Sequence, residues 1–214
     1  MTQVSVTSVL PFLVSKQLLE TIRCEDGHPL NLNYHQKRMN KSLKTLGFKN
    51  SHNLTEHITP PDQKLYRCRI IYDEKNINIE YIPYTKRLIS TLQLLQADQL
   101  EYTLKYAERN TLDTLFKLKG TADDILIVQD RFITDTTIAN IAFFDGRDWF
   151  TPKQPLLYGT TRARLLDENK IIEADIKPSD LDQYSAFALM NAMIGFNEIK
   201  NGIISPIKGA HDVI

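Results

Sequence analysis

The sequence has little cysteine and no excess of charge of either sign. Its 214 residues include only two cysteines, Cys24 and Cys68, which suggests neither a disulfide framework nor a zinc site. Lys and Arg together number 26, as do Asp and Glu, so no net charge favours binding to nucleic acid or an anionic membrane. We therefore expect a cytoplasmic protein with reduced thiols, no metal, and neither nucleic acid nor membrane as a partner.

Long apolar stretches are also missing. No window approaches the roughly 20 apolar residues that a membrane-spanning helix needs. The N-terminal stretch MTQVSVTSVLPFLVSKQ has neither a basic leader nor a small-residue cleavage pattern, so we expect no targeting segment. With 42% hydrophobic and 24% charged residues, the composition is that of a globular protein with one large domain or two small ones.

The first 86 residues predict a small α/β unit. LLETIRCEDG predicts a strand that ends in an Asp-Gly turn. NLNYHQKRMNKSLKTLG predicts a helix with an apolar stripe of Met39, Leu43 and Leu46 that ends at Gly47. KLYRCRIIYDEKNINIEYIPY predicts a hairpin that turns at residues 73–76. The next residues, PYTKR, indicate a linker, so we place a subdomain boundary between residues 86 and 87.

The remaining residues, 87–214, predict a second unit of strands and short helices. LISTLQLLQA predicts a strand, and a helix follows over 110–119 with Asn110 as its cap. Further strands are expected at 124–128 and 132–134, and IANIAFFDGRDWFTP predicts a hairpin. YGTTRARLLDEN predicts a helix that opens from a glycine, KPSDLDQY a turn of helix capped by Ser179, and SAFALMNAMIG a buried strand. The mixture of hairpins and interspersed helices predicts an α+β fold in two subdomains.

Five positions attract attention, although each has an ordinary explanation when taken alone. Lys105 can be a solvated surface lysine, and Arg38 an arginine whose stem lies along the apolar helix stripe. Asp135, at the end of a strand, can be a turn-forming aspartate. The GTT at residues 159–161 is either a simple helix cap or an anion seat. Asn191 lies in an apolar run, where a buried amide needs hydrogen-bond partners.

Taken together, these positions resemble a known family. The segments ETIRCEDGHPLNLNYHQKRM, LKYAERNTL, DDILIVQDRFITDTTIANIAFFDGRDWFTP and LLYGTTRARLL resemble, in order and spacing, the class IV family of pyridoxal-phosphate-dependent enzymes. That family contains branched-chain and D-amino-acid aminotransferases and aminodeoxychorismate lyases. The resemblance covers residues from about 19 to 207. It implies pyridoxal 5'-phosphate (PLP) as cofactor, the two-subdomain fold of the D-amino-acid aminotransferase group, and a homodimer.

The resemblance also implies roles for single residues. Lys105 becomes the catalytic lysine that forms a Schiff base with PLP, a role that requires a partly neutral amine. Arg38 matches the arginine that pairs with the cofactor phosphate, which suits a guanidinium. Asp135 falls where the family has a glutamate facing the pyridine nitrogen. Further cofactor contacts are implied for Asn140, Thr160, Thr161, Asn191 and Ala192.

Substrate-binding residues are less sharply predicted. Alternation places Arg67 and Arg69 on one face of a strand, with Cys68 on the other. Candidates to hold a substrate carboxylate are Arg23, Arg67, Arg69 and Arg109. The ordinary alternative for strand arginines is that they discourage edge-to-edge aggregation.

Three departures from the family pattern bear on function. Asp135 is one methylene shorter than glutamate, VSKQLLETIR has no glycine, and Ile194 stands where related lyases often have arginine. The chain most resembles lyase modules of folate synthesis, which implies a 4-amino-4-deoxychorismate lyase that eliminates pyruvate to leave 4-aminobenzoate. Two alternatives stay open: an aminotransferase acting on branched-chain or D-amino acids, and a PLP-binding protein without turnover.

Overall fold

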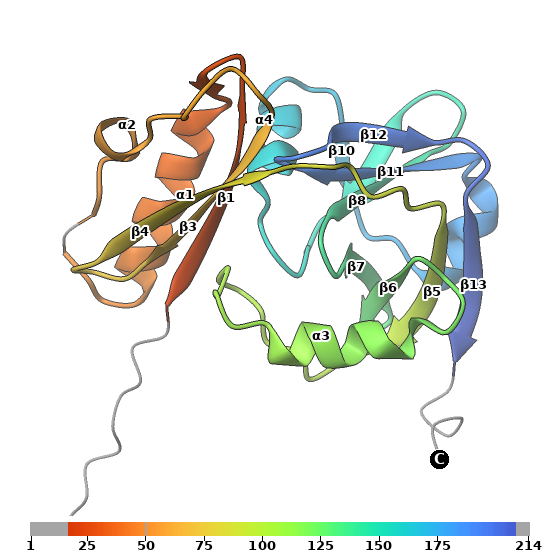
Figure 1. Cartoon of the computed structure of the whole chain (residues 1–214). Helices are drawn as coiled ribbons and strands as arrows, with labels where there is room; N and C mark the ends of the chain where they lie inside the picture. The colour runs from red at the N-terminus through yellow and green to blue at the C-terminus, as the bar shows by residue number, and fades with distance from the viewer. Residues whose placement is uncertain (1–16, 50, 209–214) are drawn as a thin grey trace, which may run out of the picture.

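The computed structural model of the chain describes residues 17–49 and 51–208. Apart from Gln17, the N-terminal stretch for which we expect no targeting segment lies outside these residues. The described residues form two sheets, and four α-helices pack around them (Figure 1). No helix in this part of the chain is long and apolar enough to cross a membrane.

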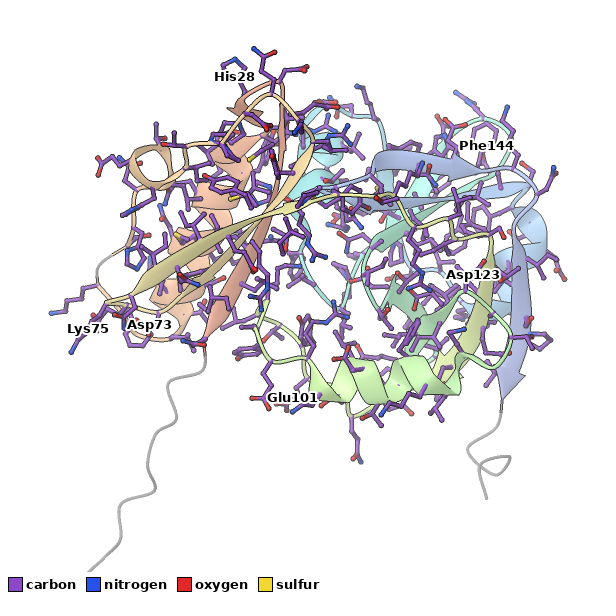
Figure 2. The ribbon with its side chains drawn as sticks, in the orientation of Figure 1. His28, Asp73, Lys75, Glu101, Asp123 and Phe144 are labelled. Atoms are coloured by element: carbon purple, nitrogen blue, oxygen red, sulfur yellow. The ribbon has the colours of Figure 1, made fainter. Side chains whose placement is uncertain are left out.

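The first sheet is antiparallel, with its four strands in the order β2-β1-β3-β4. The strands are β1 (Leu18–Glu25), β2 (His28–Pro29), β3 (Tyr66–Tyr72) and β4 (Ile77–Pro83). The predicted hairpin is confirmed, with Asp73 and Lys75 at its turn (Figure 2). The Asp73 N–H donates to the Asn76 carbonyl at 3.0 Å. The Asp-Gly turn after β1 is also present, with Asp26 and Gly27 both at positive φ.

Helix α1 (Leu32–Thr45) covers one face of this sheet (Figure 1). Its buried Met39 and Leu43 pack against Ile22 of β1 and Cys68 of β3. Gly47 lies just past the helix end at φ +83°, as the sequence predicts. The short helix α2 (Leu54–His57) follows. Because strand side chains alternate between faces, the opposite face of the sheet is left for other contacts.

The second sheet has nine strands, seven of them in the order β10-β9-β8-β7-β6-β5-β13, while β11 pairs with β8 and β12 pairs with β11. The strands are β5 (Thr91–Gln96), β6 (Asp124–Gln129), β7 (Phe132–Thr136), β8 (Asn140–Phe144), β9 (Trp149–Pro152), β10 (Ile172–Ala174), β11 (Ala186–Asn191), β12 (Gly195–Ile199) and β13 (Ile203–Lys208). The predicted strands 124–128 and 132–134, the β8–β9 hairpin and the buried strand β11 are therefore confirmed. The α+β class is confirmed as well.

The remaining helices are α3 (Asn110–Phe116) with a 3₁₀ turn, η1 (Lys117–Lys119), then α4 (Thr160–Asp167) and the 3₁₀ helix η2 (Pro178–Gln183). Helix α4 begins after Gly159, as expected. Two predicted caps are wrong. Asn110 is the first helical residue, and its side chain contacts Glu108 instead of capping the helix. Lys177, not Ser179, precedes η2, and its N–H donates to the Asp180 carboxylate at 2.8 Å.

The segment between β5 and α3 carries Lys105 and differs from its predicted form. Alternate burial of Leu100, Tyr102 and Leu104 persists, but residues 97–109 form no strand beyond one bridge to β1. The segment is fixed by backbone hydrogen bonds: the Leu19 N–H donates to the Lys105 carbonyl at 2.8 Å, and the Ala107 N–H to the Gln17 carbonyl at 2.9 Å. Lys105 is thereby held beside the start of β1.

Candidate active site

A cavity of about 330 Å³ lies between the two sheets, within the size range of small-molecule and cofactor sites. The uncovered face of β1 and β3, the Lys105 segment, the β7–β8 turn and the start of α4 all contribute to its wall. The predicted residues that line it are Arg38, Arg67, Arg69, Lys105, Arg109, Asp135, Asn140, Thr160, Asn191 and Ala192. Thr161 and Arg23, also predicted, do not line it.

Lys105 has the electrostatic environment that an amine nucleophile requires. Burial, and then the positive charge of Arg38, lower the pKa of Lys105 to about 7, while the negative charge of Glu20 opposes this shift. A buried ammonium loses hydration, so the neutral amine is favoured. At neutral pH a large share of Lys105 is therefore unprotonated. The surface-lysine interpretation is wrong, because the side chain lines the cavity and is only partly exposed.

Arg38 is held by a buried carboxylate. The Arg38 Nε donates to Glu20 Oε1 at 2.8 Å, and Nη2 donates to Oε2. His35, one turn earlier on α1, contacts the same Oε2 through Nδ1 at 2.7 Å. Burial alone would raise the pKa of Glu20, but the Arg38 charge and these hydrogen bonds lower it to about 2. Burial holds the pKa of His35 below its usual value.

Asp135 is a second buried carboxyl, and its pKa is shifted in the opposite direction to that of Glu20. It is 3% exposed, and burial raises its pKa to about 7. Asp135 Oδ2 accepts from the Leu157 N–H at 2.8 Å, and Oδ1 accepts from the Asn140 side chain at 2.8 Å. No cation pairs with Asp135 among the described residues. A cationic ring nitrogen is a group that would supply the missing charge.

Asn140 and Gly159 are fitted closely to each other. The Asn140 Nδ2 donates to the Leu157 carbonyl at 2.8 Å as well as to Asp135. A Cβ on Gly159 would lie only 1.9 Å from Asn140 Oδ1. Gly159 therefore lets the start of α4 approach the Asp135 side of the cavity. At that start, the first N–H groups of the helix have no intrahelical partner and can face an anion.

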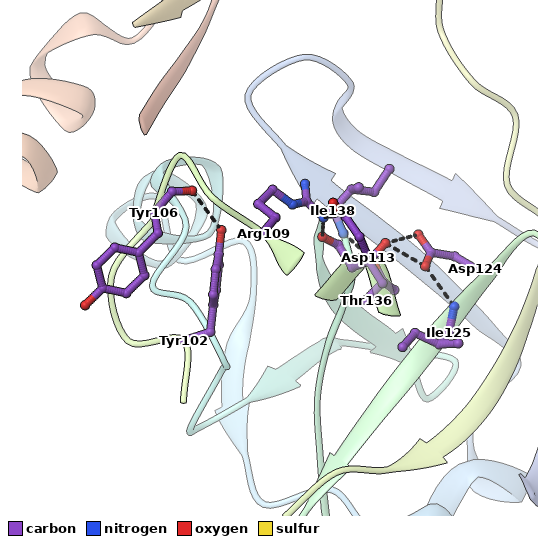
Figure 3. A network of polar contacts seen from close by, with 9 residues as sticks. Tyr102, Tyr106, Arg109, Asp113, Asp124, Ile125, Thr136 and Ile138 are labelled. Atoms are coloured by element: carbon purple, nitrogen blue, oxygen red, sulfur yellow. Dashed lines mark hydrogen bonds and ion pairs between the residues drawn. The ribbon is translucent and has the colours of Figure 1, made fainter. Parts of the chain in front are cut away.

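Arg109 belongs to a polar network behind the β7–β8 turn (Figure 3). Its Nη2 donates to the Thr137 carbonyl at 2.8 Å. The Thr137 hydroxyl donates to Asp124, a fully buried carboxyl on β6, at 2.8 Å. The Asp124 carboxylate also accepts from the Ile125 N–H at 2.8 Å. Arg109 thus connects the Lys105 segment to the turn that follows Asp135.

The turn between β11 and β12 forms another part of the wall. Asn191 Oδ1 accepts from the N–H groups of Met193 and Ile194 at 2.9 and 3.0 Å, and Nδ2 donates to the Ile138 carbonyl at 3.2 Å. Arg23 supports this turn from β1 by donating to the Met193 carbonyl at 2.7 Å. Its other nitrogens donate to Glu25. The Arg23 guanidinium is therefore occupied by protein partners, and Arg23 itself does not line the cavity.

Arg67 and Arg69 lie on the cavity face of β3, and Cys68 is fully buried on the other face, as alternation predicts. Arg69 is 3.7 Å from Glu80 on the neighbouring strand. The Nε atoms of Arg67 and Arg109 are buried without a hydrogen-bond partner in the described part of the chain. Guanidinium groups at a cavity wall are suited to an anionic ligand.

Glu20 and His35 were missed by the sequence interpretation. A signal was present, because Glu20 occupies the same strand face as Leu18 and Ile22 in a predicted strand. A carboxylate on a core-facing position needs a partner. The spacing of His35 and Arg38 places both on one helix face, where they supply it.

These residues fit PLP. The fit rests on the Lys105 amine of lowered pKa, on the buried Asp135 carboxyl, with which no cation pairs among the described residues, and on the guanidinium groups at the cavity wall. A phosphate-bearing cofactor with a basic ring nitrogen and a carbonyl group complements all three. The cavity volume is sufficient for such a group.

Comparison with known proteins identifies the family to which this chain belongs. The model of the amino-transferase class IV family matches residues 76–201, more than half of the chain. A Haemophilus influenzae relative, named only as an uncharacterized protein, is 38% identical over 184 residues, which span 83% of this chain and 98% of that protein. The chain therefore belongs to the class IV aminotransferase family, whose members depend on PLP.

Solved structures agree with this assignment. A Haemophilus somnus 129pt protein described as a "putative 4-amino-4-deoxychorismate lyase" superposes with a TM-score of 0.77 at 35% identity, over 84% of this chain and 97% of its own. A Mesorhizobium loti protein described as a "putative amino-acid aminotransferase" superposes with a TM-score of 0.76 at 24% identity, over 86% and 98% of the two chains. The second similarity supports the fold alone.

Proposed function

We propose that this protein is a PLP-dependent lyase that acts on 4-amino-4-deoxychorismate and forms pyruvate and 4-aminobenzoate. The observation that carries the proposal is the meeting of Lys105, Arg38 and Asp135 in one cavity. The lyase rather than another family activity is supported by the Haemophilus somnus protein, which is described as a "putative 4-amino-4-deoxychorismate lyase" and is 35% identical to this chain.

Lys105 would act as the proton carrier. The two products together contain all the atoms of the substrate, so no water is consumed, and a proton taken up must also be given back. An amine with a pKa near 7 suits both transfers, because neither its base form nor its acid form is scarce. The Lys105 Nζ would accept a proton from the substrate and later donate one to the departing three-carbon group.

The other residues would bind and orient. Arg38 would hold the cofactor phosphate by a charge-assisted hydrogen bond, with help from the N-terminus of α4 at Thr160. Asp135 would keep the ring nitrogen protonated. PLP supplies, when bound, an electron sink for negative charge that develops on the substrate. Because the pKa of Asp135 is about 7, its carboxyl would give up its proton to the ring nitrogen near neutral pH.

An aminotransferase is the second candidate. The family model that matches the chain is that of the class IV amino-transferases, and the same lysine can serve a proton shift within a bound amino acid. The two activities differ in their products rather than in the groups that hold the cofactor.

We also propose a homodimer. Leu88 and Ile203 are 81% and 61% exposed. Ile203 lies on the edge strand β13, where its N–H donates to the carbonyl of Ser90, two residues after Leu88. Exposed apolar side chains at a sheet edge favour association. Light scattering after gel filtration should give twice the mass of one chain. A single-chain mass would reject the dimer.

Product analysis tests the activity. The purified protein with PLP is incubated with aminodeoxychorismate, branched-chain amino acids or D-alanine, the amino acids together with a 2-oxo acid acceptor. Pyruvate and 4-aminobenzoate in equal amounts support the lyase. Amino-group transfer without 4-aminobenzoate supports the aminotransferase instead. A visible cofactor band that none of the substrates shifts would indicate a PLP-binding protein without turnover.

A further inference from the structure

We infer that Glu20 is a positioning residue that holds Arg38 ready for an anion and offsets the positive charge of Arg38 at the cavity that Lys105 lines. Glu20 touches neither the cavity nor any group proposed to react. Its side chain is fully buried between β1 and α1, among the apolar residues of that interface. A carboxylate placed there costs free energy, so the position requires an explanation beyond packing. The inference rests on the proposed role of Arg38 as a phosphate ligand.

The first part of the argument is the geometry of the guanidinium. One edge of the Arg38 guanidinium, formed by Nε and Nη2, donates two hydrogen bonds to the Glu20 carboxylate. Its remaining nitrogen, Nη1, makes no hydrogen bond among the described residues, and Arg38 lines the cavity. A guanidinium has five N–H donors in a rigid plane. Fixing one edge therefore fixes the direction of the other, and less conformational entropy is lost when an anion binds.

The second part is the position of Glu20 relative to Lys105. The residue before Glu20 is joined to Lys105 by the backbone hydrogen bond from the Leu19 N–H to the Lys105 carbonyl at 2.8 Å. Arg38 is bonded to Glu20 and lines the same cavity as Lys105. Without Glu20, the positive charge of Arg38 would act on Lys105 unopposed.

His35 completes the arrangement. Its Nδ1 lies 2.7 Å from Glu20 Oε2, and a neutral imidazole that donates there adds a hydrogen bond but no charge. The net charge of the three side chains is then close to zero, so the cluster can be buried. The cavity still receives a directed N–H donor from Arg38.

The experiment compares Glu20→Gln with Glu20→Asp. Glutamine keeps the size of the side chain but removes its charge. Aspartate keeps the charge, but its shorter side chain places the carboxylate farther from Arg38. The matched control is Glu168→Gln, which removes a carboxylate that contacts two cations, Arg164 and Lys170, at the end of α4 and away from the cavity. Two quantities are measured in each folded protein: affinity for PLP, and the pKa of Lys105 from the pH dependence of its acylation rate in the PLP-free protein.

We expect Glu20→Gln to bind PLP at least about tenfold more weakly and to lower the pKa of Lys105. Glu20→Asp should also bind PLP more weakly but leave the Lys105 pKa near that of the wild type. Glu168→Gln should change neither quantity. A folded Glu20→Gln protein with unaltered PLP affinity and unaltered Lys105 pKa would overturn the inference, because a structural role alone predicts only a lower melting temperature.

A crystal structure of the wild type soaked with inorganic phosphate tests the same inference without a substitution, should neither variant fold. Arg38 should keep its two bonds to Glu20 while Nη1 contacts the anion. An Arg38 that leaves Glu20 to reach the anion would contradict us. Failure of the wild type to bind PLP at all would instead reject the proposed function, so the two failures are distinguishable.

Discussion

At the scale of single residues, Lys105 shows how burial creates reactivity. Its pKa of about 7 lies far below that of an exposed lysine, because the cavity hydrates the ammonium poorly and Arg38 repels it. The amine is therefore available at neutral pH without a separate base.

Lys105→Ala should abolish the visible absorbance of bound PLP, because no other lysine among the described residues lines the cavity. Borohydride treatment of the wild type with PLP should attach the cofactor to the peptide that contains Lys105. Lys64→Ala, at an exposed lysine on another part of the chain, is the control and should keep the band. Attachment to a different lysine would reject the assignment.

Asp135 is predicted to act on the ring rather than as a turn residue. Asp135→Asn should still form the covalent link to PLP, since Lys105 is unchanged. Proton removal from substrate should slow by several orders of magnitude, because an uncharged amide stabilises a ring cation poorly. Asp135→Glu should retain activity if the family's longer side chain can be accommodated. Stopped-flow absorbance measures the step, and normal turnover of the asparagine variant would contradict this role.

At the scale of elements, most of the fold could be predicted from the sequence. The hairpins have turn residues between alternating strands, and α1 has an apolar stripe, so local chemistry and tertiary packing agree there. The caps at Asn110 and Ser179 were wrong, because several polar residues near each helix start compete and the sequence does not rank them. The Lys105 segment alternates like a strand, yet its order comes from hydrogen bonds to β1, a partner distant in sequence.

The approach of α4 to β8 is a contact between elements that can be tested directly. Gly159 has an ordinary φ of −71°, so alanine meets no backbone strain there. Its Cβ would nevertheless collide with Asn140 Oδ1. Gly159→Ala should lower stability by about 1–3 kcal/mol and weaken PLP binding, because Asn140 would be pushed from Asp135 and Leu157.

A double-mutant cycle isolates this collision. In the Asn140→Ala background the amide is gone, so Gly159→Ala should cost clearly less than in the wild type. Chemical denaturation gives the four free energies of unfolding. Equal costs in both backgrounds would show that the two residues do not interact.

At the scale of the whole molecule, the cavity is the feature that residue patterns alone could not predict. Lys105, Arg38 and Asp135 come from three segments, and only the family resemblance predicted that they meet. Arg23 was a candidate substrate ligand, yet the fold uses it to support the turn at Met193. Glu20 lies inside a segment that resembles the family, but its role depends on α1 packing over β1. Contacts between distant segments are set by tertiary packing, which a single sequence does not specify.

Two of the buried carboxyls, Glu20 and Asp135, predict opposite slopes in the pH dependence of stability. Glu20 has a folded pKa of about 2, below its ordinary 4.5, so the unfolded chain binds more protons between these values. Its stabilising contribution is complete above pH 4.5 and is lost as pH falls towards 2. Asp135 has a folded pKa of about 7, above its ordinary 3.8. Its contribution is complete below pH 3.8 and is lost as pH rises towards 7.

Their combined contribution to the PLP-free protein should therefore be greatest near pH 4 and change by about 1.4 kcal/mol per pH unit on each limb. Urea denaturation across this range measures it, and single variants separate the limbs from other titrating groups. Asp135→Asn should flatten the curve between pH 4 and 7 relative to wild type but leave the acid limb. Glu20→Gln should flatten the curve below pH 4 and leave the slope between pH 4 and 7 unchanged. If Asp135→Asn leaves the slope above pH 4 unchanged, Asp135 is already ionised in the folded protein, and its carboxylate would meet the cofactor ring without first losing a proton.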